Sequence, residues 1–177
     1  LNAALEAESV GGAGNDAPAA AEDLDGLWWV LTNDLARLAV AGTLTAGETD
    51  GYALQLSADA AVDVLVSDAA ATGGVRVALY DATDVLLAVS RGEGREGSEA
   101  IANWRVPAPG RYRLAVTGAA GDYLLVVGRG LAIPPVDSPT QAAAFAPAGR
   151  AGVAGRIRRI GQLYGVDVNG SNPPTLV

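Results

Sequence analysis

The sequence predicts an all-β protein, an antiparallel β-sandwich of about eight strands that is jelly-roll-like. Between residues 38 and 128, short runs alternate apolar and polar side chains with a period of two. This period puts one face of a strand on a core and the other towards water. Turn-forming residues part the runs, and none of the runs has helical spacing. Short strands at regular spacing are typical of a sandwich.

The run 62–67 shows the alternation most clearly. Its Val62, Val64 and Val66 fall on the predicted core face, and Asp63 falls on the face predicted to meet water. We therefore expect Val64→Asp to unfold the domain and Asp63→Ala to be nearly silent. In the same way, the run 100–106 places Trp104 inward together with Ala102 and Val106. The predicted strands are 38–44, 52–57, 62–67, 75–80, 85–90, 100–106, 111–116 and 123–127. On four of them, Val64, Val77, Leu114 and Leu125 are predicted to lie in the core.

Residues 1–37 form an N-terminal segment that we expect to pack on this sandwich. Its first eight residues are compatible with one or two helical turns, which the glycines that follow would end. The apolar run 27–31 holds two adjacent tryptophans, Trp28 and Trp29. Alternation places one indole inward and one outward, and the alternative is that the N-terminal segment or the tail covers both.

Residues 129–177 form an extended arm, because repeated Pro and Gly deny it regular strands. Residues 1–128 carry 7 Arg and 18 acidic residues, a net charge of −11, whereas the arm carries a net charge of +3. The arm is also more apolar than a disordered tail, which predicts that it lies on a surface. The predicted partner-binding residues are Arg156, Ile157, Ile160, Leu163 and Tyr164.

The composition excludes several kinds of chemistry. There is no Cys and no His, which rules out disulfides, thiolate chemistry and the usual general base. The acidic body disfavours nucleic acid, and no apolar run reaches the length of a membrane span. We therefore expect a protein that is not an enzyme. The chain begins at Leu1 rather than at Met, which predicts a processed or excised chain.

Four motifs in order carry a family resemblance. They are GTLTAGETDGYALQL at 42–56, VRVALYDATDVLLAVS at 75–90, PAPGRYRLAVTG at 107–118 and GDYLLVV at 121–127. In order and spacing, residues 38–128 resemble the bacterial pre-peptidase C-terminal domain. Members of that family are small, non-catalytic β-sandwiches attached to secreted proteases and surface proteins. The resemblance implies a secreted, periplasmic or cell-surface location, and a role in secretion, stability or attachment.

The resemblance also implies a calcium site. Related collagen-binding domains of bacterial collagenases bind Ca²⁺ through an acidic N-terminal segment and an Asp in a turn. The matching positions in this sequence are Glu6, Glu8, Asn15, Asp16 and Asp50. Ca²⁺ takes six to eight oxygen ligands, which these side chains, carbonyls and water can supply. The alternative is that they are ordinary solvated acids.

Two functions of different classes follow. The first is a structural subunit whose sandwich and arm mediate assembly with other subunits, either copies of itself or a larger surface complex. The second is a calcium-dependent module that binds matrix or polysaccharide. The arm favours assembly, whereas an exposed aromatic platform, for which Trp28, Trp29 and Tyr80 are the candidates, would favour the binding module.

Overall fold

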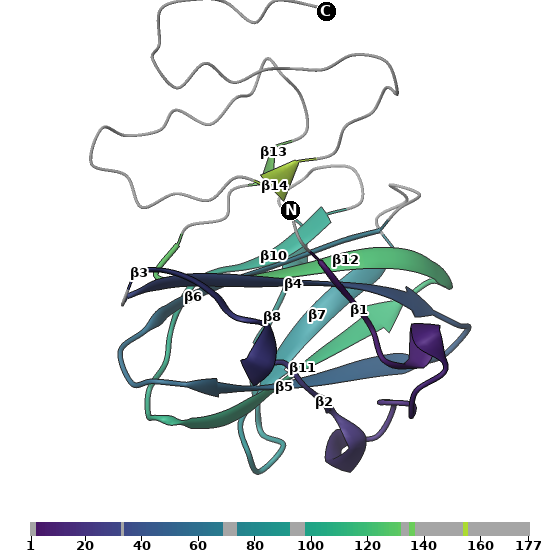
Figure 1. Ribbon diagram of the computed structural model, residues 1–177, viewed down its shortest axis with the longest axis horizontal. Coiled ribbons are helices and arrows are strands. Elements are labelled where there is room, and N and C mark those ends of the chain that lie inside the picture. Colours follow the sequence, from purple (N-terminus) through teal and green to yellow (C-terminus); the bar gives the residue numbers. More distant parts are fainter. Residues whose placement is uncertain are drawn as a thin grey trace, which may run out of the picture.

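The computed structural model describes residues 3–32, 34–68, 74–92 and 98–131, with the backbone of 135–136 and 154–155. Two β-sheets pack face to face (Figure 1), so the prediction of a β-sandwich is confirmed. Sheet A runs in the order β1 (Ala4–Leu5), β4 (Leu35–Leu44), β12 (Gly121–Arg129), β6 (Ala61–Asp68), β10 (Ser98–Arg105) and β9 (Arg91–Gly92), and β3 (Trp29–Thr32) also pairs with β4. Sheet B runs in the order β2 (Glu22–Asp23), β5 (Thr49–Leu56), β11 (Gly110–Gly118), β7 (Val75–Tyr80) and β8 (Leu86–Val89).

Eight strands are connected as in a jelly roll, namely β4, β5, β6, β7, β8, β10, β11 and β12. Except for the hairpin of β7 and β8, each of them is followed along the chain by one in the opposite sheet. The first and last of the eight, β4 and β12, are therefore neighbours and pair antiparallel from Leu44↔Gly121 to Ala36↔Arg129. The two-residue strands β13 (Pro135–Val136) and β14 (Ala154–Gly155) pair with each other and belong to neither sheet.

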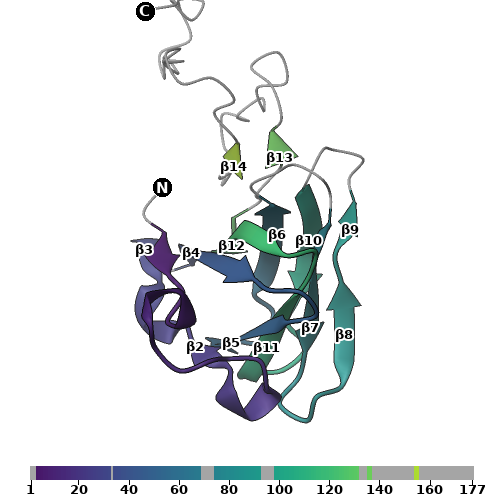
Figure 2. The same ribbon diagram turned by 90° about the vertical axis from the view of Figure 1, so that its right-hand side faces the viewer.

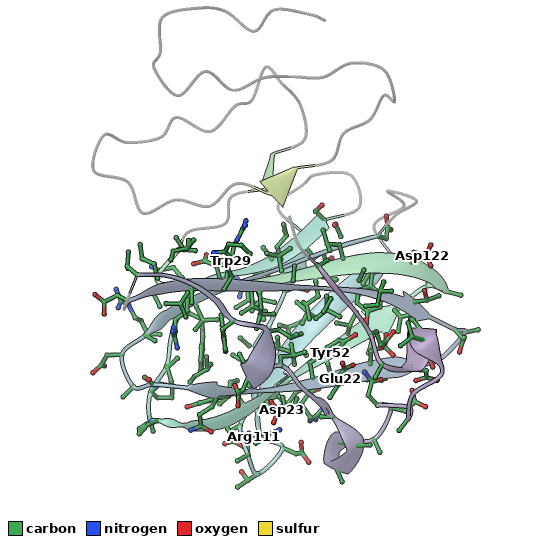
Figure 3. All side chains as sticks on the ribbon, viewed as in Figure 1. Glu22, Asp23, Trp29, Tyr52, Arg111 and Asp122 are labelled. Carbon is green, nitrogen blue, oxygen red and sulfur yellow. The ribbon has the colours of Figure 1, made fainter. Side chains whose placement is uncertain are left out.

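The core fills the space between the two sheets. Alternation gives each long strand an inward face, and Figure 3 shows Tyr52 of β5 between the layers. Each fully buried Val, Leu or Tyr side chain stabilises the fold by about 1.5–3 kcal/mol through the apolar area removed from water. Val64, Val77, Leu114 and Leu125 are all buried, as the alternation predicted.

The outer face of sheet A differs from the prediction. Asp63 is only 9% exposed and Leu65 only 4%, so this face does not meet water as predicted. The Asp63 carboxylate accepts a hydrogen bond from the backbone N–H of Asn103 on β10, at 3.0 Å. The premise that Asp63 is dispensable is therefore wrong, because its carboxylate has a buried structural partner.

That partner lies in a β-bulge. The register of β10 against β6 shifts between Ile101 and Trp104, and Asn103 has a φ of 50°. Asn tolerates this left-handed region better than most residues. Because the bulge breaks the alternation, Ala102 is exposed, contrary to the prediction. Trp104 still packs on the core, with its ring edge-on to Tyr112 at 5.5 Å.

Asp63→Ala is expected to lower the free energy of unfolding by about 1–3 kcal/mol, because it leaves the Asn103 N–H without its acceptor. Asp63→Asn keeps an acceptor oxygen and is the matched control, so it should retain most of the stability. Urea denaturation of the three proteins measures the difference. Equal midpoints for Asp63→Ala and the parent protein would contradict the assigned bulge.

The N-terminal segment pairs with both sheets. Strand β1 pairs in parallel with β4, and β2 pairs in parallel with β5. The predicted helical turn at residues 1–8 is therefore wrong, since Ala4–Leu5 is a strand and helical structure begins only with the short 3-10 helix η1 (Glu8–Val10). Figure 2 shows this purple segment along the edge of the sandwich opposite β8 and β9.

The two tryptophans have different surroundings. Trp28 packs against the core, with the Arg129 guanidinium 5.2 Å from its ring centre. Trp29, in contrast, is 53% exposed, so one indole points inward and one outward. Tyr80 is partly covered, because the Arg113 guanidinium lies 4.3 Å above its ring.

The arginines on the outer face of sheet B are engaged in ion pairs. Arg111 pairs with Asp23 at 3.0 Å, and Figure 3 shows the two side chains close together. Arg113 pairs with Asp84 at 2.9 Å. The described part of the chain contains no helix with the length and hydropathy of a membrane span.

Candidate metal centre

Four carboxylates converge where the N-terminal segment meets the start of β5. Glu8 lies on η1, and Asp16 lies in the loop before η2 (Pro18–Ala20). Glu48 and Asp50 come from the turn after β4 and the first residues of β5. One carboxylate oxygen of each residue lies within 4.8 Å of the others. We call Glu8, Asp16, Glu48 and Asp50 the acidic cluster.

Glu6 lies behind the acidic cluster and anchors it. Its side chain is 1% exposed, and Oε1 accepts hydrogen bonds from Asn15 Nδ2 at 3.1 Å and from the Tyr52 hydroxyl at 3.0 Å. Its Oε2 accepts a hydrogen bond from the backbone N–H of Thr43 at 3.2 Å. A buried carboxylate with this many donors is satisfied where it lies. Glu6 therefore holds the N-terminal segment on the sandwich.

The loop that carries Asp16 passes very close to β5. The backbone N–H of Gly51 donates a hydrogen bond to the Asn15 carbonyl at 3.1 Å. A Cβ at position 51 would lie 2.8 Å from that carbonyl oxygen, closer than two such atoms can approach. Glycine at this position therefore lets Asp16 approach Asp50.

Two tyrosines connect Asp50 to Glu6. Tyr123 donates from its hydroxyl to Asp50 Oδ2 at 2.5 Å, Tyr52 donates to Glu6 Oε1, and the two hydroxyls are hydrogen-bonded to each other. These three contacts need three protons, and the hydroxyls supply two. Burial raises the pKa of both tyrosines, so they keep their protons. Below its pKa of about 7 Asp50 carries the third proton, and the direction of its contact then reverses: Asp50 donates to Tyr123, Tyr123 to Tyr52 and Tyr52 to Glu6.

Two oxygens at this place accept no hydrogen bond. Asp50 Oδ1 and Asn15 Oδ1 are both buried, and neither has a partner. Asp50 is 1% exposed and Asn15 is 2% exposed. A buried acceptor without a donor costs about 1–3 kcal/mol. A cation bound among the four carboxylates would provide the missing partner for Asp50 Oδ1, and Asn15 is adjacent in the chain to Asp16.

The acidic cluster also lacks positive charge. Among the described residues, the ion pairs involve Glu99, Asp23 and Asp84, and none reaches the cluster. Desolvation, and then the Glu48, Asp16 and Glu6 carboxylates, raise the pKa of Glu8. Burial, together with Glu6 and Glu48, raises the pKa of Asp50 to about 7 although the Tyr123 hydrogen bond lowers it. The group of acids is therefore stable as anions only with a counter-ion.

The chemistry of the donors selects a hard cation. All the side chains offer oxygen, which Ca²⁺ and Mg²⁺ prefer over softer metals. Opposite ligands of Ca²⁺ lie about 4.6–5.2 Å apart, whereas those of Mg²⁺ lie about 4.0–4.2 Å apart in a strict octahedron. The four oxygens lie within 4.8 Å of one another, which admits the ligand spacing of either ion, so the preference for Ca²⁺ rests on the motif resemblance.

Without calcium, stability is expected to fall as the pH rises from about 4 to about 7. The folded state holds the Asp50 proton up to a pKa of about 7, whereas the unfolded state loses it near the ordinary value of 3.8. This contribution is therefore fully present below pH 3.8 and lost as the pH passes 7. Urea midpoints of metal-stripped protein measure this loss, and Asp50→Asn should flatten it. A loss unchanged in Asp50→Asn would assign it to other groups.

The structure brings together most of the residues predicted to hold calcium. Glu8, Asp16 and Asp50 meet in the acidic cluster, whereas Glu6 and Asn15 support it from behind. Sequence reasoning missed Glu48. Its signal was the spacing of Glu48 and Asp50 at a strand start, where residues two apart share a face. The predicted partner-binding residues Arg156, Ile157, Ile160, Leu163 and Tyr164 lie outside the described residues.

Comparison with known proteins gives matches among solved structures. No family model and no curated protein matches the chain. The pre-peptidase C-terminal domain of a collagenase from Bacillus anthracis is 25% identical, and the match covers 50% of this chain and 86% of that one with a TM-score of 0.44. The chain resembles a pre-peptidase C-terminal domain. The four motifs predicted a resemblance to the same kind of domain.

Periplasmic inhibitors of g-type lysozyme also match. The inhibitor from Aeromonas hydrophila is 15% identical, with 62% of this chain and 95% of that one covered and a TM-score of 0.43. The inhibitor from Salmonella Typhimurium is 18% identical, with 61% and 97% covered and a TM-score of 0.38.

Proposed function

We propose that this chain is a non-catalytic β-sandwich module that binds one Ca²⁺, and that this ion fastens the N-terminal segment to the sandwich. The observation that carries the proposal is the acidic cluster. The four carboxylates have no positive partner among the described residues, and one of them, Asp50, has a buried oxygen without a hydrogen-bond partner. The motif resemblance to calcium-binding relatives supports the same ion.

The ion would act as a cross-link. Glu8 and Asp16 belong to the N-terminal segment, whereas Glu48 and Asp50 belong to the sandwich. A ligand that binds only the folded arrangement stabilises it by RT ln(1 + [L]/Kd), which grows with the logarithm of the ligand concentration over the dissociation constant. Extracellular calcium modules work at about 10⁻⁴–10⁻³ M. A secreted, periplasmic or surface location would supply such a concentration.

A binding role is better supported than an assembly role. An exposed aromatic side chain was the feature that would favour a binding module, and Trp29 is 53% exposed. The arm, on which the assembly prediction depends, lies outside the described residues apart from the backbone of β13 and β14. We therefore propose a module that calcium stabilises and that attaches to a partner, and assembly through the arm stays a prediction.

The melting temperature of metal-stripped protein tests the calcium proposal. At a hundredfold excess over the dissociation constant, Ca²⁺ should add about 2.7 kcal/mol of stability. Mg²⁺ at the same concentration should add much less, because a four-carboxylate shell on two loops does not enforce its strict octahedron. A melting temperature that responds to neither ion would remove the ion from the proposed function.

A further inference from the structure

We propose that the β3 edge of sheet A binds an extended segment of a partner protein, one that carries a large apolar side chain beside an acidic residue. This inference goes beyond the calcium proposal, and it uses no residue of the acidic cluster. We call the surface formed by β3 and the cavity next to it the edge site.

The edge site begins with an interruption in strand pairing. On the outer edge of β4, β3 pairs with Leu35, Ala36 and Arg37, whereas β1 pairs with Val40 and Ala41. Leu38 and Ala39 lie between these two partners, and no described strand pairs with them on this side. Leu38 and Ala39 are themselves buried, so what this side of β4 offers is a short unpaired stretch of strand edge, the kind of feature to which an extended peptide can add.

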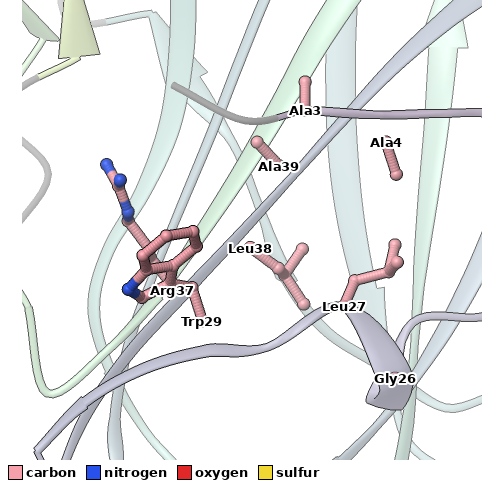
Figure 4. A pocket seen from close by; sticks show the side chains of 8 residues that line it. All are labelled: Ala3, Ala4, Gly26, Leu27, Trp29, Arg37, Leu38 and Ala39. Carbon is pink, nitrogen blue, oxygen red and sulfur yellow. The ribbon is translucent and has the colours of Figure 1, made fainter.

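A cavity of about 270 Å³ opens at this interruption. Figure 4 shows Trp29 and Arg37 at one end, Leu27 and Leu38 in the middle, and two alanines at the other end. This volume is sufficient for one large apolar side chain. Except for the Arg37 guanidinium, the side chains that line it are apolar, namely Ala3, Ala4, Leu27, Trp29, Leu38 and Ala39.

Strand β3 itself is apolar and unprotected. Trp29 is 53% exposed, Val30 59% and Leu31 48%, and the run 27–32 contains no charge and no proline. Edge strands of soluble proteins are normally shielded by a charge, a proline or a covering segment. A contiguous exposed apolar patch on a folded domain marks an interaction surface. The edge site therefore has the character of one half of an interface.

Arg37 decides the kind of partner. No described carboxylate pairs with Arg37, which lines the cavity. Arg91 has no described carboxylate partner either, but it lies at the opposite edge of the sheet. Trp29 and Arg37 are direct partners in the β3–β4 ladder, so the apolar and charged contacts are adjacent. A partner segment with a carboxylate next to a large apolar side chain would pair with Arg37 and also fill the cavity beside Trp29. A sugar would instead need several polar neighbours around the indole, and among the side chains that line the cavity with Trp29 only Arg37 is polar.

A selection experiment tests the proposal. A displayed library of random decapeptides is selected on the immobilised full chain, once with about 1 mM Ca²⁺ and once with chelator. Selected peptides should share a large apolar residue within two positions of Asp or Glu. One of them is then synthesised with a fluorescent label and measured by anisotropy. Trp29→Ala should weaken its binding by about tenfold or more, since an exposed aromatic anchor carries much of such an interface.

Arg37→Gln should weaken the same peptide by about tenfold, and this loss should vanish for the peptide whose acidic residue is replaced by its amide. Arg91→Gln, an equal charge change on the exposed β9 at the opposite edge, is the matched control and should have no effect. Unchanged melting temperatures show that the variants are folded. The affinity for the peptide is expected to be the same in chelator and in calcium, which would show that the edge site binds independently of the calcium site.

Three results would overturn the proposal. The first is selection of no peptide, or of peptides that are indifferent to Trp29→Ala and Arg37→Gln. The second is retention on dextran, xylan or another polysaccharide that Trp29→Ala abolishes, which would assign the edge site to sugars. The third is a dimer in light scattering that Trp29→Ala dissociates, which would assign the edge site to a second copy of the chain.

Discussion

Removal of calcium is expected to raise the hydrogen-exchange rates of residues 6–16 about a hundredfold, which corresponds to loss of about 2.7 kcal/mol of binding free energy at a hundredfold excess. This segment is held by Glu6 and by the acidic cluster, and the cluster repels itself once the ion is gone. Exchange followed by mass spectrometry, with and without chelator, measures the effect. The strands β6 and β10 should change little, because the ladder between them contains no residue of the acidic cluster.

Matched variants separate the ion from a general charge effect. Glu48→Gln removes one carboxylate of the acidic cluster and should give fast exchange at residues 6–16 even with calcium present. Asp34→Asn makes the same charge change at the other end of β4 and should behave like the parent protein. Equal protection of the segment with and without chelator would show that Glu6 alone holds it.

Val64→Asp is expected to abolish folding. Val64 is 1% exposed at the centre of β6, opposite Ile101 on one side and Val127 on the other. An ionised carboxylate there has no partner, and its burial costs several kcal/mol against a total stability of about 5–15 kcal/mol. Far-ultraviolet circular dichroism and the loss of a cooperative thermal transition measure the effect.

Thr117→Asp is the control for this substitution. Thr117 is exposed on β11 and lies opposite Arg76 of β7, so the added carboxylate meets water and a cation. The variant should keep the parent's cooperative transition within about 0.5 kcal/mol. A folded, cooperative Val64→Asp protein would mean that the two faces of β6 are assigned the wrong way round.

The strands could be predicted from the sequence because each one alternates. All eight predicted strands are present, and the predicted core positions Val64, Val77, Leu114 and Leu125 are buried. Alternation assigns residues to two faces, but it does not show whether the second face is exposed. Asp63 and Leu65 are buried on the outer face of sheet A, and this burial depends on the packing of the folded chain rather than on the period of two.

Local irregularities were also beyond the sequence pattern. The bulge at Asn103 shifts Ala102 out of the alternation between buried and exposed positions. A pattern with a period of two cannot predict where one extra residue is inserted. The N-terminal strand β1 has only two residues, so its pairing with β4 depends on tertiary contact rather than on propensity. The position of such a short edge strand is determined by the strand with which it pairs.

The candidate site was partly predictable. The motif resemblance pointed to Glu8, Asp16 and Asp50, which the fold brings together from segments over thirty residues apart. It did not separate the acids that face the ion from Glu6, whose oxygens are taken up by Asn15, Thr43 and Tyr52. The tyrosine link between Asp50 and Glu6 joins β5 to β12, and no sequence spacing shows that pairing.

The most direct test of the account is calorimetric titration of metal-stripped protein with Ca²⁺. The account predicts one ion per chain for the parent protein and for Asp34→Asn, and no measurable binding for Asp50→Asn or Glu48→Gln. Binding should also release close to one proton near pH 6, because Asp50 keeps its proton up to a pKa of about 7 until the ion displaces it. Absence of binding at millimolar Ca²⁺, or one bound ion that survives Asp50→Asn, would contradict the assignment of the acidic cluster as a calcium site.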